Sequence, residues 1–193
     1  MATTTRTAPR TSFVRERFGV FAECLLTGVW ITVAALPLVT LPAAFAAGSR
    51  HLSRHLAGEA SGVRAFAADV REAFRTGWRI SLLWWAALAL LAFDAQVARS
   101  GLLPGGRPLL LVSLIGLPAV AVWGLRTAAA WRPGTPWAHT ARTAGRRTLT
   151  DPAGSLLLVG GFVALALAAR QIPPLAAPAL GCLAAAAVAA DRR

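Results

Sequence analysis

The side chains that could do chemistry in this chain are few, and they lie inside apolar stretches. Residues 18–36 contain one charged residue, Glu23. An ionisable group in the hydrocarbon of a bilayer is costly unless it is paired or hydrated, so each one is a candidate functional residue. If the chain folds back near Val39, Glu23 comes level with Arg54 and His55. We therefore predict that Glu23 pairs with one of these two residues.

Three roles are open for this predicted pair. The first role is a structural ion pair that lets a short helix enter the membrane. The second is a site for a solute or a proton, and the third is a group solvated at the membrane interface. Asp94 and Arg170 form a second candidate pair, because each lies near the outer end of an apolar run. The alternative for this second pair is two separate residues hydrated among the lipid headgroups.

No arrangement typical of an enzyme accompanies these residues. The sequence has no G-x-S-x-G motif, no phosphate-binding loop and no paired carboxylates. His51 and His55 have the i, i+4 spacing of a metal-binding pair, but no Cys or third His follows at ligand spacing. We therefore predict no enzyme activity, no metal and no cofactor.

The elements that position these residues are predicted to be membrane helices. The 193 residues are 56% hydrophobic and only 15% charged, and the mean hydropathy is +0.57, which is typical of proteins with several membrane spans. A net charge of +12 would suggest nucleic acid binding in a soluble protein. Here the arginines lie between apolar runs, so we predict the lipid bilayer as a partner and no nucleic acid.

Three residues mark a break after the first apolar run. Pro37 lacks an amide hydrogen, Thr40 can cap a new helix, and Pro42 is tolerated in the first turn of that helix. The segment that follows, 43–57, is too short and too charged to lie alone in lipid. The rival interpretation of this region is a secretory signal peptide with a small-x-small cleavage sequence at 44–46.

Together these patterns predict an all-α polytopic membrane helix bundle. It has about five to six transmembrane segments, one of them short and broken by proline, and two basic amphipathic cytoplasmic helices. The N-terminal tail is expected to be disordered because it has almost nothing to bury. The predicted spans are 18–36, 43–57, 80–97, 109–125, 153–169 and 175–190, the amphipathic helices are 62–78 and 135–147, the tail is 1–11, and 12–193 is a single transmembrane domain.

The stretch 62–78 places its apolar residues near one face of a helix. The opposite face holds the charged residues Arg64, Asp69, Arg71, Glu72 and Arg75. This pattern is typical of a helix that lies in the headgroup layer. The alternative is a short helix that caps the bundle.

A capping residue and several small residues allow predictions about the last two spans. Asp151 followed by Pro152 predicts a capped start for the fifth span. Small residues on the two spans are expected to allow the helices to approach closely. These small residues are Gly154, Gly160 and Gly161 on the fifth span, and Gly181 with 184–187 on the sixth.

The arginines are distributed unevenly among the predicted connectors. If the chain crosses six times, 17 arginines fall on one side and only Arg99, Arg107 and Arg170 fall on the other. Arginine-rich connectors stay in the cytoplasm. The sequence therefore predicts a multi-pass protein of the cell membrane with both termini cytoplasmic.

One pattern in the first half of the chain resembles that of a known family. It comprises Leu36, Pro37, Thr40, Pro42 and Ala43, then Phe66 and Phe74 in a basic amphipathic stretch, and then the apolar run 80–94. This pattern is similar to that of the YesL-like family, small bacterial integral membrane proteins of unknown function. The resemblance implies a place in the bacterial inner membrane and an association with sugar import, with an ABC-type sugar permease as partner. It implies no catalytic residue.

These observations favour an integral membrane protein that serves as an accessory component of carbohydrate uptake. The alternative is a small-solute transporter that uses Glu23 and Arg54 as a gated site, and the similar motifs at 37–43 and 174–179 are consistent with two related halves, as found in transporters. The two hypotheses differ in what surrounds Glu23. A transporter requires a water-filled cavity beside it, whereas an accessory protein has it closed off by packing.

Overall fold

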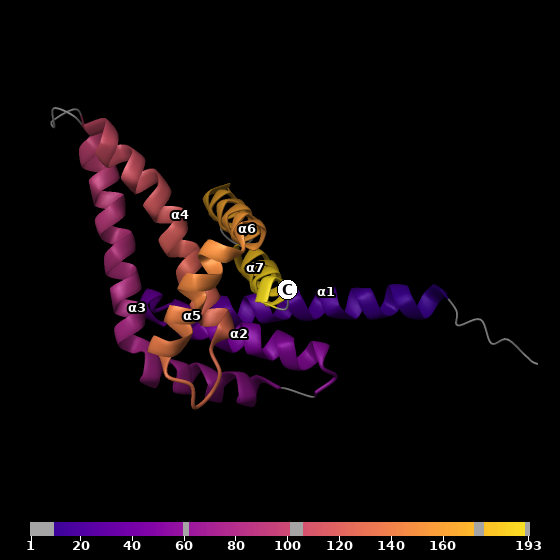
Figure 1. Cartoon of the computed structure of the whole chain (residues 1–193). Helices are drawn as coiled ribbons and strands as arrows, with labels where there is room; N and C mark the ends of the chain where they lie inside the picture. The colour runs from indigo at the N-terminus through magenta and orange to yellow at the C-terminus, as the bar shows by residue number, and fades with distance from the viewer. Residues whose placement is uncertain (1–9, 60–61, 101–105, 172–175, 192–193) are drawn as a thin grey trace, which may run out of the picture.

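The computed structural model describes residues 10–59, 62–100, 106–171 and 176–191. All regular elements within these ranges are helices, which confirms the predicted all-α architecture. Figure 1 shows how they are arranged. In chain order they are α1 (Arg10–Ala34), the 3-10 helix η1 (Leu38–Thr40), α2 (Leu41–Leu56), α3 (Val63–Arg99), α4 (Gly106–Ala130), α5 (Trp137–Thr150), α6 (Pro152–Gln171) and α7 (Ala176–Asp191).

The core is built around α2. Residues 42–49 of this helix are all buried, and α2 packs against α1, α3, α4 and α7. Four of the buried residues are alanines, whose small side chains allow neighbouring backbones to come close. The segment that is too short and too charged for lipid is therefore enclosed by other helices.

The break between α1 and α2 falls where the prolines predict it. Helix α1 ends at Ala34, and Pro42 lies in the first turn of α2. Thr40 precedes α2, but its hydroxyl makes no cap to that helix. Instead, Thr40 Oγ1 donates to the carbonyl oxygens of Ala34 (2.6 Å) and Pro37 (2.9 Å). Its hydroxyl thus satisfies the carbonyl end of α1, because η1 turns the side chain back toward that helix.

Helix α3 is continuous, whereas the sequence predicts an amphipathic helix and a separate span that meet near Arg79. Hydropathy changes at this boundary, but no proline interrupts the helix there. Figure 1 shows that the first part of α3 lies along α2 and the second part along α4. Thr76 Oγ1 donates to Glu72 O (2.8 Å), and Gly77 follows. Both features favour a bend.

Three helices, α3, α4 and α6, are long and apolar enough to cross a membrane. The apolar parts of α1 and α7, 18–34 and 176–190, are shorter, and Figure 1 shows α1 and α2 running crosswise to α4. Large apolar side chains are exposed along α1, α3, α4 and α6. Such a surface is matched by lipid and costly in water. The chain is therefore a membrane protein, and its five to six crossings remain a prediction.

The start of α6 and the proline inside α4 agree with the predictions from the sequence. The amide of Gly154 donates to Asp151 Oδ1 (3.0 Å), so the predicted cap is formed. Pro118 lies inside α4. Basic α5 begins directly after Pro136, within two residues of its predicted start. These elements could be predicted because each depends on residues adjacent in the chain.

Two glycines mark a close approach between the described parts of α1 and α7. A Cβ atom on Gly28 of α1 would overlap the Ala177 carbonyl oxygen, and one on Gly181 of α7 would overlap the Cys24 carbonyl oxygen. Gly181 was predicted to serve the contact of the last two spans, but its close neighbour is α1. Gly161 does approach α7, at Leu183, whereas no atom lies near Gly160.

Several predictions fall outside the described residues. They concern residues 1–9 of the tail, most of the connector between α3 and α4, and the prolines at 173–174, where the second of the two similar motifs begins. Residues 10 and 11, predicted to belong to the tail, are part of α1.

Candidate functional site

The first polar pair joins α1 to α2. His51 Nε2 and Glu23 Oε1 lie 2.7 Å apart and share a hydrogen bond. The predicted pairing of Glu23 with Arg54 or His55 is wrong, because the hairpin turns about Pro37 rather than farther along the chain. His51 is one helical turn before His55, which is exposed.

The Trp30 ring packs against the imidazole of this pair. The Trp30 ring lies 4.9 Å from the His51 ring and 5.5 Å from the Phe66 ring, measured between centroids. His51 is 1% exposed, while the Glu23 side chain keeps 23% of its surface exposed. The imidazole is therefore fully buried in the core, and the carboxylate is only partly buried.

A second cluster joins α2 to α3. Asp69 Oδ2 accepts a hydrogen bond from Arg54 Nη1 (2.9 Å) and lies 3.5 Å from Arg50 Nε. The sequence places Asp69 on the exposed face of its helix, but its side chain is only 8% exposed. That prediction is wrong because two arginines of α2 compensate the buried carboxylate, and a buried charge persists when it is paired.

The charges around Arg50 act on one another. Burial lowers the pKa of the Arg50 guanidinium from its ordinary value, and the nearby charges of Arg54 and Arg132 lower it further. Asp69 and Glu72 act in the opposite direction. Arginines from two separate parts of the chain, α2 and the segment after α4, thus act on one another electrostatically.

A third pair links α4 to the junction of α5 and α6, and it was not predicted. Arg126 Nη2 donates to Asp151 Oδ2 (2.9 Å), and the same guanidinium reaches the carbonyl oxygens of Arg147 and Asp151. Arg126 is 8% exposed. The signal in the sequence is an arginine flanked by apolar residues near the end of a span. Such a residue needs an acceptor from another element.

Asp94 and Arg170, the second predicted pair, form no ion pair with each other in the part of the chain that the structure describes. Helices α3 and α6 each pack against α4, and an apolar groove of about 590 Å³ lies between them. Arg170 is exposed and Asp94 is partly buried. Asp94 and Arg170 thus belong to two helices that have this groove between them.

Three hollows are formed by the described residues, and Glu23 lines none of them. An apolar cavity of about 40 Å³ is lined by residues from α2 to α7, including Trp84, Trp123 and Trp137. The groove between α3, α4 and α6 is also lined by apolar side chains. A third hollow, of about 740 Å³, lies on the charged face of α3. Neither Glu23 nor His51 lines any of these three, and among the described residues no His, Cys, Asp and Glu side chains gather into a metal site.

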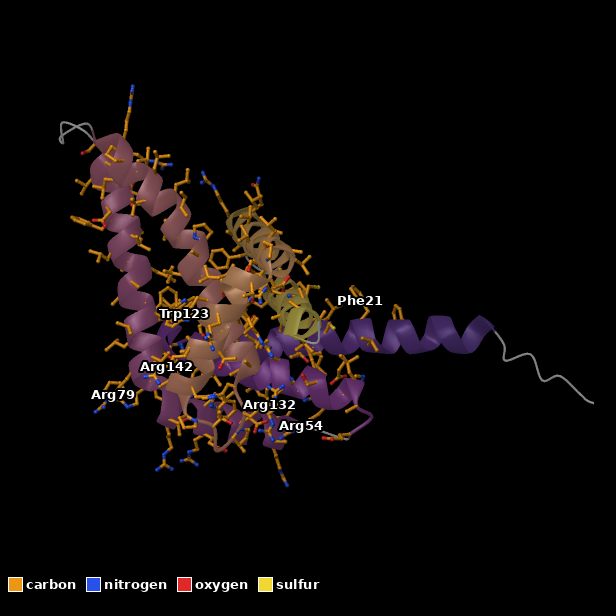
Figure 2. All side chains as sticks on the ribbon, in the orientation of Figure 1. Phe21, Arg54, Arg79, Trp123, Arg132 and Arg142 are labelled. Carbon is orange, nitrogen blue, oxygen red and sulfur yellow. The ribbon has the colours of Figure 1, made fainter. Side chains whose placement is uncertain are left out.

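The two basic segments lie together at one end of the molecule. Figure 2 shows Arg54, Arg79, Arg132 and Arg142 away from the tip of the α3–α4 hairpin. Helix α5 is attached to α3 there, because Trp137 Nε1 donates to Thr76 Oγ1 (3.1 Å) and the Trp137 ring lies on Gly77. We call this surface the arginine face; it comprises the exposed residues Arg64, Arg71, Arg75, Arg79, Arg132, Arg142, Arg146 and Arg147.

The fold and the arginine face define an all-helical membrane protein with one strongly basic end. Comparison of the chain with protein-family models, with curated proteins and with solved structures gives no match. The resemblance to the YesL-like family therefore remains a hypothesis that rests on the sequence pattern alone.

Proposed function

We propose that this chain is an accessory, non-enzymatic component of a transport assembly in the bacterial inner membrane. The arginine face contacts the partner, and the sequence resemblance points to an ABC-type sugar permease as that partner. Because arginine-rich segments stay in the cytoplasm, the arginine face and both termini are cytoplasmic in this proposal.

The residues that surround Glu23 favour an accessory role over transport. Glu23 is paired with His51, and Trp30 packs over the imidazole. Transport through this hairpin would require a polar, water-filled path at the pair. The described cavities are lined by other residues, and the two that lie among the helices are apolar. This arrangement supports a structural pair.

Affinity purification from native bacterial membranes tests the proposed partner. The full chain with a C-terminal tag is solubilised in mild detergent, and the captured proteins are identified by mass spectrometry. We expect a sugar permease to co-purify with the wild type and to be depleted when Arg71, Arg75 and Arg142 are all replaced by Gln. These three side chains are exposed, so the replacements leave the fold intact. Recovery of the chain alone, with solute uptake in liposomes, would instead establish the transporter.

Glu23→Gln separates the two functions at a single residue. Glutamine keeps an oxygen that can accept from His51 but removes the charge, so we expect a loss of about 1 kcal/mol in folding stability. Association with the partner should persist. Glu59→Gln, at an exposed position, is the matched control for stability. Retained stability of Glu23→Gln together with abolished solute uptake by the purified protein would contradict the accessory role.

A further inference from the structure

Two arginines of α2 form an unusual pair. Arg50 and Arg54 are four residues apart, so their side chains lie on the same face of the helix. Like charges at this spacing destabilise a helix. Asp69 lies against both of them, but a single carboxylate neutralises only one guanidinium.

Arg132 brings a third guanidinium to this cluster from the segment after α4. Its Nη1 donates to the carbonyl oxygens of Ala129 (3.0 Å) and Trp131 (2.8 Å), which fixes the orientation of the group. These are the hydrogen bonds that its side chain makes within the described residues, so its Nε and Nη2 edges stay available. The side chain is exposed, and Figure 2 shows it at the same end of the molecule as Arg54. Its charge acts on Arg50.

The acidic groups do not balance these three charges. Asp69 is committed to Arg50 and Arg54, and Glu72 is exposed and forms no ion pair within the described residues. Arg50 Nη1 is buried and lacks a hydrogen-bond acceptor among the described residues. A buried donor without an acceptor is costly. The cluster therefore has both excess positive charge and a missing acceptor.

We propose that Arg50, Arg54 and Arg132 form a binding site for the phosphate group of a phosphomonoester. Guanidinium groups bind phosphate oxygens through paired hydrogen bonds, and a dianion with several acceptor oxygens matches the excess positive charge of this cluster. A phosphate oxygen would supply the acceptor that Arg50 Nη1 lacks among the described residues. The phosphate comes either from a lipid headgroup at the membrane surface or from a free phosphate compound. The site is independent of the identity of the protein partner.

Binding to the full-length protein tests this site. Titration calorimetry in nonionic detergent measures the binding of inorganic phosphate, which stands for a free phosphate compound. Native mass spectrometry of protein taken from nanodiscs of phosphatidylcholine with phosphatidic acid measures retention of the lipid. Arg132→Gln is the test variant because the side chain is exposed and anchored only to backbone. Arg142→Gln on α5 is the matched control, and the melting temperature of each variant verifies its fold.

The outcomes separate the two sources and also expose a failure. Saturable phosphate binding that weakens about tenfold in Arg132→Gln and not in Arg142→Gln supports a site for a free phosphate compound. Absence of phosphate binding, with phosphatidic acid retained by the wild type and lost from Arg132→Gln alone, supports a lipid site. Equal effects of the two variants, or no retention of either ligand by the wild type, would overturn the proposal.

Discussion

Replacing Gly181 with alanine is expected to lower the folding stability by about 3 kcal/mol, because the new methyl group has no room. Its Cβ would overlap the carbonyl oxygen of Cys24 and lie 3.0 Å from the amide nitrogen of Gly28. Both are backbone atoms of α1, so no side chain can rotate out of the way. The helices would have to separate, and their close packing along this contact would be lost.

Gly160→Ala in α6 is the matched control, since no atom lies within 4 Å of the position a Cβ would take. Alanine favours a helix over glycine by about 1 kcal/mol, so this control is expected to be neutral or stabilising. The two variants are compared by thermal unfolding in one detergent at one heating rate. For a chain of this size, 3 kcal/mol corresponds to a fall of about 6–12 °C in Tm. Equal melting temperatures for Gly181→Ala and the wild type would show that the terminal helices are not held together by this contact.

The features that could be predicted from the sequence depend on neighbours in the chain. Pro37 and Pro42 locate the break after α1, and Asp151 locates the start of α6. Each of these residues acts on its own backbone within one helical turn. The local sequence alone therefore determines where the helix ends or begins. The long apolar runs likewise predict α3, α4 and α6 as candidate spans.

The polar partners could not be predicted because they depend on how far each helix turns before it meets the next. A short 3-10 helix between α1 and α2 moves the fold-back point, and the partner of Glu23 shifts by one turn to His51. Helix periodicity places Asp69 on a polar face, yet arginines of another helix bury it. A pattern along one helix contains no information about the charges that a distant helix presents.

The boundary within α3 could not be predicted from hydropathy. The change from a basic to an apolar composition near Arg79 predicts two elements, but a helix ends only where its backbone hydrogen bonds are interrupted. No proline lies between 63 and 99, so one helix continues from the arginine face into the apolar hairpin with α4. This continuity joins the basic end of the molecule to a candidate membrane span within one helix.

Asp69→Asn is expected to destabilise the protein by about 3 kcal/mol, because removal of one partner leaves two partly buried arginines without a counter-charge. The Arg50 and Arg54 side chains are only 21% and 23% exposed, so water compensates them incompletely. Asparagine retains the shape of the side chain and one oxygen. The loss therefore reports the missing charge and not a cavity.

Glu72→Gln is the matched control, since Glu72 lies one turn along the same helix, is exposed and forms no ion pair in the described part of the chain. Its effect is expected to be within about 0.5 kcal/mol, as for other surface substitutions. Adding Arg54→Gln to Asp69→Asn should recover part of the loss, because one of the two uncompensated cations is then removed. All variants are compared by thermal unfolding in the same detergent. Two results would show that Asp69 does not hold α2 and α3 together through these arginines. One is equal melting temperatures for Asp69→Asn and Glu72→Gln. The other is a double variant whose loss of stability equals the full sum of the losses of the two single variants.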